Sequence, residues 1–205
     1  AIMEYKQAFD LVAPEEYVPL IELAVPALKN LSQRQYESFQ TALLGFIQAD
    51  NEFSFKEWIL YQLIISQVGA QYAPATARRG IKAPPYNEMA SAAETLLTAL
   101  ARLEPAPAKA GPALAAGLKA MLLPVADLPP KPAPETLARS LETLQRSPER
   151  IRDNFLYGAL GVIAYDKQLT TPEAMFLRAT SLCLARPVPQ VAYSKLLGLS
   201  AAATN

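Results

Sequence analysis

The sequence has no histidine among its 205 residues. A Ser-His-Asp triad and the zinc-binding HExxH helix both require histidine, so this chain can contain neither. It also lacks the GxxxxGK[ST] loop and the GxGxxG turn, the glycine patterns that bind phosphates and dinucleotides. These absences lead us to expect a non-catalytic chain with no catalytic residue of its own.

Cysteine and long apolar runs are also scarce. Cys183 is the only cysteine, which excludes an intrachain disulfide, and its apolar neighbours predict a buried position. The longest apolar run, 156–165, is about half of the roughly 20 residues that a membrane-spanning helix needs. No signal peptide is evident, and the start at Ala1 is not typical of a translation start. We therefore expect an excised fragment that is soluble by itself.

The chain has no excess of either charge. Nineteen basic residues balance nineteen acidic ones, and the sequence pI is about 6.6. A neutral chain has little electrostatic attraction for nucleic acid or for an anionic membrane. We therefore expect no nucleic-acid partner, and membrane association only through a part of the protein outside this sequence.

What the sequence has in abundance is helical periodicity. Apolar residues recur at the spacing i, i+3, i+4, i+7, whereas the alternating β-branched runs typical of strands are few. Eighteen prolines fall mostly between the periodic segments. The pattern predicts an all-α helical bundle with helices at about 4–12, 15–29, 33–49, 55–72, 87–103, 108–122, 134–146, 148–165, 171–185 and 190–198. Pro19 lies in the first turn of its helix, and Pro26 should kink or split it.

Two segments of the chain match each other at an offset of 116 residues. The matched pairs are Arg34/Arg150, Phe39/Phe155, Gly45/Gly161, Ile47/Ile163, Asp50/Asp166, Phe53/Leu169, Ser54/Thr170 and Glu57/Glu173. Such self-similarity indicates an internal repeat. We expect one domain over 1–205, with repeat one at about 32–72, an Ala/Pro-rich helical insertion at about 73–146, and repeat two at about 147–186. The repeats should be pseudo-symmetric, and the matched glycines, Gly45 and Gly161, suggest close helix crossings.

Each repeat predicts two helices joined by a short turn that carries an aspartate. Ser32 with Gln35, and Ser147 before Pro148, are expected to begin the first helix of each copy. The second helix should begin with a capping box, formed by Ser54 and Glu57 in one copy and by Thr170 and Glu173 in the other. A connection this short predicts an αα-hairpin.

The carboxylates of the two turns are Asp50, Glu57, Asp166 and Glu173. Their spacing differs from that of an EF-hand loop, which needs a glycine at position 6 and a glutamate at position 12. Two interpretations remain open. The four carboxylates could bind a divalent cation such as magnesium or calcium, for which oxygen ligands are suited. Alternatively, they shape the turns and cap the helices without any cofactor.

The turns resemble those of TerB-like helical proteins of the tellurite-resistance type. That family carries Ala-Asp-Gly, an apolar residue, and a glutamate seven residues after the aspartate, usually twice in a domain. The first copy here reads Ala49-Asp50-Asn51-Glu52-Phe53-Ser54-Phe55-Lys56-Glu57, and the second reads Tyr165-Asp166-Lys167-Gln168-Leu169-Thr170-Thr171-Pro172-Glu173. Asn51 and Lys167 stand at the glycine position. The resemblance implies that the acidic turn residues contact metal.

A second resemblance covers about 15–57 and 147–186. The run from Tyr17 to Ser32, followed by Tyr36, Phe39 and 47–50, is similar to the C-terminal region of bacterial membrane-bound zinc metallopeptidases of the HtpX-like, CAAX-prenyl-protease type. In those proteins a membrane peptidase domain bearing HExxH precedes a helical tail. The resemblance implies an accessory domain of an inner-membrane protein, on its cytoplasmic side, that binds a protein partner or the peptidase domain of the same chain. The alternative is a free-standing TerB-like metal-binding or stress-response module.

Overall fold

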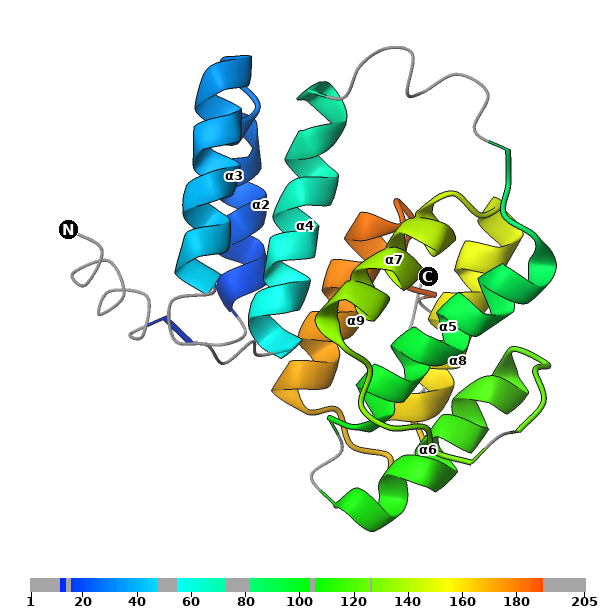
Figure 1. Cartoon of the computed structure of the whole chain (residues 1–205). Coiled ribbons are helices and arrows are strands. Elements are labelled where there is room, and N and C mark those ends of the chain that lie inside the picture. Colours follow the sequence, from blue (N-terminus) through cyan, green and yellow to red (C-terminus); the bar gives the residue numbers. More distant parts are fainter. Residues whose placement is uncertain are drawn as a thin grey trace, which may run out of the picture. The chain divides into compact units, whose positions relative to one another are not determined.

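A computed structural model describes residues 12–13, 16–47, 55–72, 82–103, 106–125 and 127–189 (Figure 1). These residues form eight α-helices and no strand, which confirms the all-α prediction. The chain divides into two compact units, 1–73 and 74–205. The division falls where the predicted insertion begins, and the expectation of one domain over 1–205 stays a prediction.

Unit 1 contains three helices: α2 (Tyr17–Leu28), α3 (Gln33–Ile47) and α4 (Phe55–Tyr72). Helix α4 packs against both α2 and α3. One buried cluster joins one residue of each helix, namely Val25, Tyr36 and Val68. The partly buried apolar residues around it are Ile21, Leu28, Leu31, Phe39, Ile64 and Tyr72. The apolar face that the sequence predicts for each helix therefore forms the core of this unit.

The end of α4 closes the turn between α2 and α3. The Tyr72 hydroxyl lies 2.7 Å from the carbonyl oxygen of Leu31 and 3.1 Å from that of Leu28. These carbonyls lie at the end of α2 and just after it, where a helix leaves acceptors without partners. Tyr72 also stacks on Tyr36, with ring centroids 4.2 Å apart. Burial raises the pKa of Tyr36, and the neighbouring Tyr61 and Tyr72 raise it further.

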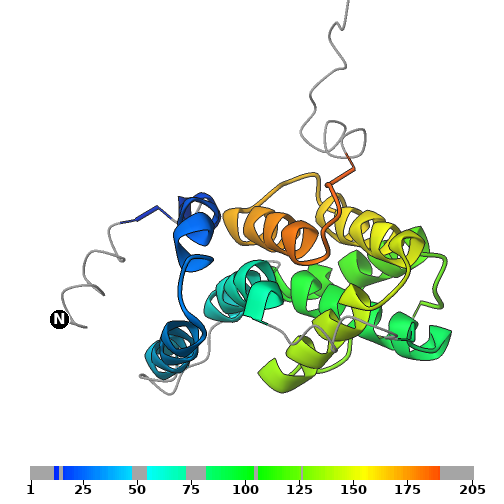
Figure 2. The same cartoon turned by 90° about the horizontal axis from the view of Figure 1, so that it is seen from above.

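Unit 2 contains five helices: α5 (Tyr86–Ala101), α6 (Pro107–Ala120), α7 (Pro134–Gln145), α8 (Glu149–Ile163) and α9 (Thr171–Cys183). The most extensive pairings join α5 to α7 and α6 to α8, and α9 packs on α8 (Figure 2). The Ala-rich helices α5 and α6 therefore pack on α7 and α8. The core includes Leu96, Leu97, Leu100, Leu114, Leu118, Leu141, Leu144, Phe155 and Phe176.

Eight of the ten predicted helices are present, and the other two, 4–12 and 190–198, lie outside the described residues. Pro19 falls in the first turn of α2, as predicted. Of the two outcomes predicted for Pro26, the split is wrong, because α2 continues through Pro26 to Leu28, and the kink stays a prediction. Only two helical residues follow Pro26, so little helix remains for the proline to interrupt. Cys183 is buried, as predicted, and Trp58 is buried as well.

The predicted start of α8 at Ser147 is wrong. Pro148, rather than Ser147, is the N-cap residue, and the helix begins at Glu149. The Ser147 hydroxyl instead donates a hydrogen bond of 2.8 Å to the carbonyl oxygen of Thr143 in the preceding helix. In unit 1 the helix start predicted at Ser32 is confirmed, because Ser32 and Gln35 form a capping box before α3. The Gln35 side chain accepts from the Ser32 N–H at 2.8 Å, and the Ser32 hydroxyl accepts from the Gln35 N–H at 3.4 Å.

Candidate functional sites

The turn between α8 and α9 positions Asp166. One carboxylate oxygen, Oδ1, accepts a hydrogen bond of 2.9 Å from the backbone N–H of Gln168, two residues further on. This is the local bond by which aspartate stabilises a turn. The other oxygen, Oδ2, lies 3.6 Å from the ammonium group of Lys109 in α6. The Asp166 side chain is only 11% exposed, so this ion pair is largely shielded on the aspartate side.

Lys167, the next residue, has a φ angle of 61°. This is the left-handed conformation, which glycine adopts freely and which a side chain makes unfavourable. It is also the position at which the TerB-like turn has glycine. The backbone therefore has a turn shape suited to glycine, although lysine occupies the position.

We predict that Lys167→Gly stabilises unit 2 by about 1 kcal/mol, because glycine removes the left-handed strain. Lys167→Ala is the matched control, since it removes the same charge but keeps the Cβ atom, and it should give no such gain. Urea unfolding followed by circular dichroism measures both changes. An equal effect of the two variants would show that the lysine charge, and not the backbone strain, matters.

Thr170 and Glu173 form the capping box that the sequence predicts at the start of α9. The Glu173 carboxylate accepts from the backbone N–H and from the hydroxyl of Thr170, both at 2.8 Å. The Thr170 hydroxyl accepts in turn from the Glu173 N–H at 3.4 Å. Glu173 is 4% exposed, so the carboxylate is buried at the helix N-terminus, where the dipole favours negative charge.

The four candidate metal ligands differ in their location and in their hydrogen bonds. Asp50 lies outside the described residues, as does Ser54. Glu57 is half-buried in the first turn of α4. Asp166 and Glu173 both accept hydrogen bonds from their own turn. Within the described residues, no group of three or more Cys, Asp or Glu side chains is arranged to hold a metal ion. Metal binding by the four carboxylates stays a prediction.

Glycines bring α6 and α8 into close contact. A Cβ atom added at Gly117 would lie against the Val162 side chain and 2.8 Å from the carbonyl oxygen of Gly158. One added at Gly161 would lie 3.1 Å from both the carbonyl oxygen of Ala116 and the Cβ of Ala120. The close crossing predicted at Gly161 is therefore confirmed. Among the described residues no heavy atom lies within 4 Å of a Cβ built at Gly45, so the crossing predicted there stays a prediction.

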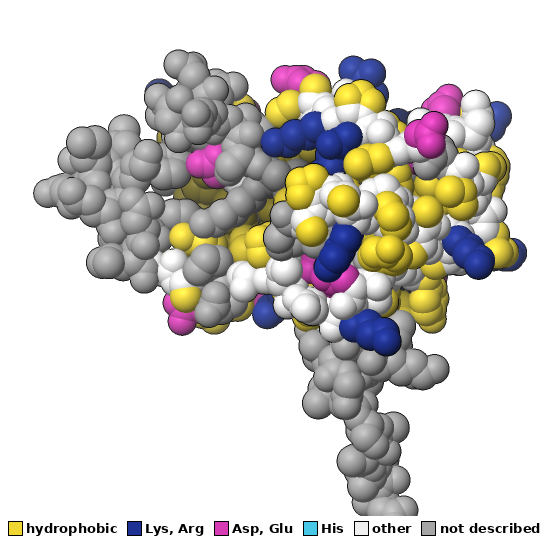
Figure 3. All heavy atoms as spheres, turned by 90° about the horizontal axis from the view of Figure 1, so that it is seen from below, with side chains coloured by type: hydrophobic (Ala, Val, Ile, Leu, Met, Phe, Trp, Pro, Cys, Tyr) yellow, Lys and Arg dark blue, Asp and Glu magenta, His cyan; other side chains and the backbone are white. Residues whose placement is uncertain are grey.

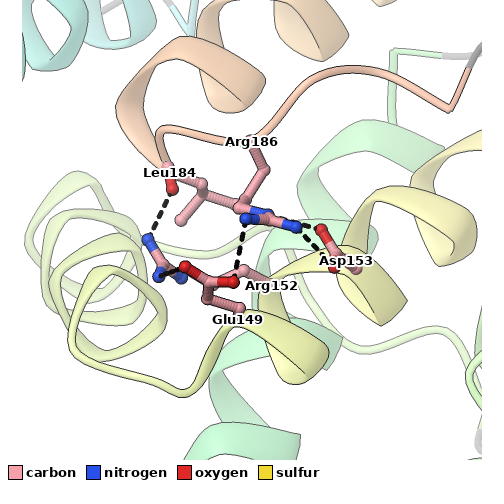
Figure 4. A network of polar contacts seen from close by, with 5 residues as sticks. All are labelled: Glu149, Arg152, Asp153, Leu184 and Arg186. Carbon is pink, nitrogen blue, oxygen red and sulfur yellow. Dashed lines mark hydrogen bonds and ion pairs between the residues drawn. The ribbon is translucent and has the colours of Figure 1, made fainter.

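An ion-pair network closes the other end of the α8–α9 hairpin (Figure 4). The Arg186 guanidinium, just after α9, pairs with both oxygens of Asp153 at 2.7 and 2.9 Å and with Glu149 at 3.1 Å. The hydrogen bond to Asp153 raises the pKa of Arg186. Arg152 donates a hydrogen bond of 2.7 Å to the carbonyl oxygen of Leu184 at the end of α9. Sequence reasoning missed this network, because Asp153 and Arg186 lie in different helical segments and share no local motif.

On the face of the molecule shown in Figure 3, the described residues form no large patch of a single charge. Lys and Arg side chains are distributed over this face among hydrophobic ones, with acidic side chains between them (Figure 3). This distribution agrees with the neutral composition of the chain. None of the helices in the described ranges is both long enough and apolar enough to cross a membrane.

Comparison with known proteins identifies no relative. No protein-family model, no curated protein and no solved structure matches the chain.

Proposed function

We propose that this chain is a non-catalytic accessory module that acts by binding protein. The observation that carries the proposal is an exposed apolar face on α2, formed by Leu20, Leu23, Ala24 and Ala27. Leu20 is 45% exposed and Leu23 is 77% exposed. The four residues follow the spacing i, i+3, i+4, i+7, by which an amphipathic helix presents its anchors to a partner groove.

The opposite face of α2 supports this interpretation. Tyr17, Val18 and Val25 are buried, so α2 already uses one apolar face within the protein. A helix that is apolar on both faces is normally covered on both. Glu22 is the only acidic or basic residue in α2, which suits a face that loses its water on binding.

The resemblance to the C-terminal region of membrane zinc metallopeptidases supplies the partner in this proposal. The module would belong to the cytoplasmic side of an inner-membrane protein and contact the peptidase domain of the same protein or a protein that it processes. All catalytic groups would then lie in the peptidase domain, since this chain has no histidine.

The coding sequence tests this assignment directly. We expect the reading frame upstream of Ala1 to encode transmembrane segments and an HExxH motif. With that protein in hand, Leu23→Glu should weaken binding of the module to the separately expressed peptidase domain. Tyr86→Glu, at a residue that is 62% exposed in unit 2, is the matched control. A reading frame without either feature contradicts the metallopeptidase assignment, and equal binding by both variants contradicts the α2 face.

A second candidate function is divalent-cation binding by a free-standing TerB-like module. One observation favours it, namely that Lys167 keeps the left-handed conformation of the turn in which that family has glycine. Against it, Asp166 and Glu173 are already engaged by Gln168, Lys109 and Thr170.

We therefore predict that calcium, magnesium and zinc leave the Tm of the chain unchanged, because a ligand that binds only the folded state must raise it. Thermal unfolding with each metal, and with a chelator as reference, provides the measurement. A rise in Tm that Asp166→Asn removes, and that the control Asp127→Asn retains, would favour the cation-binding function instead.

A further inference from the structure

The guanidinium groups of Arg152 and Arg186 lie on either side of the Glu149 carboxylate (Figure 4). Each guanidinium is also held by a partner of its own. Asp153 accepts from Nε and Nη2 of Arg186 at 2.7 and 2.9 Å. The carbonyl oxygen of Leu184 accepts from Nη1 of Arg152 at 2.7 Å. The two cations are therefore held in place before any ligand arrives, which reduces the entropy that binding must overcome.

The two arginines differ in how fully their donors are used. A guanidinium binds an oxyanion through two parallel N–H groups, and Asp153 occupies the Nε/Nη2 edge of Arg186 in this way. On Arg152 the same edge is almost unused. Its Nη2 lies 3.9 Å from Glu149, and its Nε is buried with no hydrogen-bond partner among the described residues. A buried donor without a partner is unfavourable, so this edge is suited to an oxyanion that the chain itself does not supply.

Glu149 occupies the position between the two guanidiniums only in part. One of its oxygens lies 3.9 Å from Nη2 of Arg152, and the other lies 3.1 Å from Nη1 of Arg186. Its side chain is 69% exposed. Two oxygens that each meet a different arginine leave none for Nε of Arg152. A phosphate monoester has three acceptor oxygens, one for each of these three donors, and carries about two negative charges at neutral pH.

The start of α8 adds to the attraction for an anion. Glu149 is the first residue of the helix, and the N-cap residue, Pro148, makes no side-chain cap hydrogen bond. The positive end of the helix dipole is therefore next to the two arginines. Asp153 is the other carboxylate of the network, and its charge is offset by its pairing with Arg186. With Glu149 rotated into solvent, the network keeps two cations and one anion.

We propose that Arg152 and Arg186, the arginine pair, bind a phosphate monoester group in place of the Glu149 carboxylate. Two phosphate oxygens would accept from the Nε/Nη2 edge of Arg152, and the third would accept from Nη1 of Arg186. A phosphorylated side chain of a protein or a small phosphorylated molecule supplies such a group. The inference goes beyond the proposed function, because the arginine pair lies in unit 2 and the apolar face of α2 lies in unit 1.

The test follows the Nε–H resonances of both arginines by NMR, in the full chain labelled with nitrogen-15. Inorganic phosphate is the first probe, and sodium chloride at the same ionic strength is the reference. Phosphate should shift the Arg152 resonance, and chloride should not. A short phosphoserine peptide and glycerol phosphate then distinguish the two sources. The natural source is expected to bind about tenfold more tightly than inorganic phosphate, because it adds contacts of its own.

Two exposed glutamates provide matched variants. Glu149→Gln removes the competing carboxylate and should tighten phosphate binding by about tenfold. Glu142→Gln is the control, since Glu142 is 67% exposed and lies 4.0 Å from Arg146, and it should leave the affinity unchanged. Arg152→Lys keeps the charge but removes the Nε/Nη2 edge, so it should weaken binding by about tenfold.

The Glu149→Gln result decides the question even if Arg152→Lys unfolds the chain, because Glu149 is exposed and Arg152 also bonds Leu184. The proposal is overturned if chloride shifts the Arg152 resonance as phosphate does. It is also overturned if Glu149→Gln binds phosphate no more tightly than Glu142→Gln does.

Discussion

Replacing Gly117 with alanine should destabilise unit 2 by about 2 kcal/mol. The new Cβ would collide with the Val162 side chain and lie 2.8 Å from the carbonyl oxygen of Gly158. Because that carbonyl is part of helix α8, it cannot rotate away, and α6 and α8 must separate. Overpacking costs about 1–3 kcal/mol, and contact with the backbone of α8 places this substitution at the upper end of that range. The better helix propensity of alanine returns about 1 kcal/mol, which leaves a net loss of about 2 kcal/mol. Urea unfolding followed by circular dichroism measures the difference.

Two other glycines provide graded controls for Gly117→Ala. Gly161→Ala should destabilise unit 2 less than Gly117→Ala does. The atoms nearest to the added Cβ lie 3.1 Å away and need to move by only a few tenths of an ångström. Gly45→Ala should stabilise the chain by about 1 kcal/mol, since its surroundings are open and only the helix propensity changes. If all three substitutions changed the free energy of unfolding in the same direction, helix propensity alone would explain the changes. The close crossing of α6 and α8 would then have no energetic role.

The arrangement of helices could be predicted largely from the sequence. Periodic apolar residues placed eight helices within a few residues of their ends, because that spacing reports directly which face of a helix is buried. The cap at Thr170 was predicted for a similar reason, as its partner Glu173 lies only three residues away. Ser147 shows the limit of local reasoning. Its hydroxyl donates a hydrogen bond to the helix that ends before it and does not cap the helix that begins after it.

Features that depend on distant residues could not be predicted. The pairing of Asp166 with Lys109 joins two segments 57 residues apart, and no local pattern marks it. The matched glycines, Gly45 and Gly161, look equivalent in sequence, yet within the described part of the chain only Gly161 lies at a helix crossing. Sequence similarity between two segments reports a shared local conformation. It does not report whether the same neighbour is present at both.

The second large effect is expected for Phe155→Ala, which should destabilise unit 2 by about 3–5 kcal/mol. Phe155 is fully buried in α8, and its ring lies 6.5 Å from that of Phe176 in α9 at an angle of 59°. Truncation would leave a cavity between two helices that the Arg186 network also holds together, so the site cannot easily collapse. Urea unfolding followed by circular dichroism should show a lower midpoint.

Phe39 is the residue of α3 that corresponds to Phe155, and it gives the matched comparison. Phe39 is only partly buried beside the core cluster of unit 1. Its truncation to alanine therefore removes less buried apolar area than the truncation of Phe155 does. Phe39→Ala should therefore cost about 1–2 kcal/mol. Trp58 fluorescence follows this unit, since it is the only tryptophan of the chain. Equal costs at both positions would mean that Phe39 is buried as fully as Phe155 in the protein in solution.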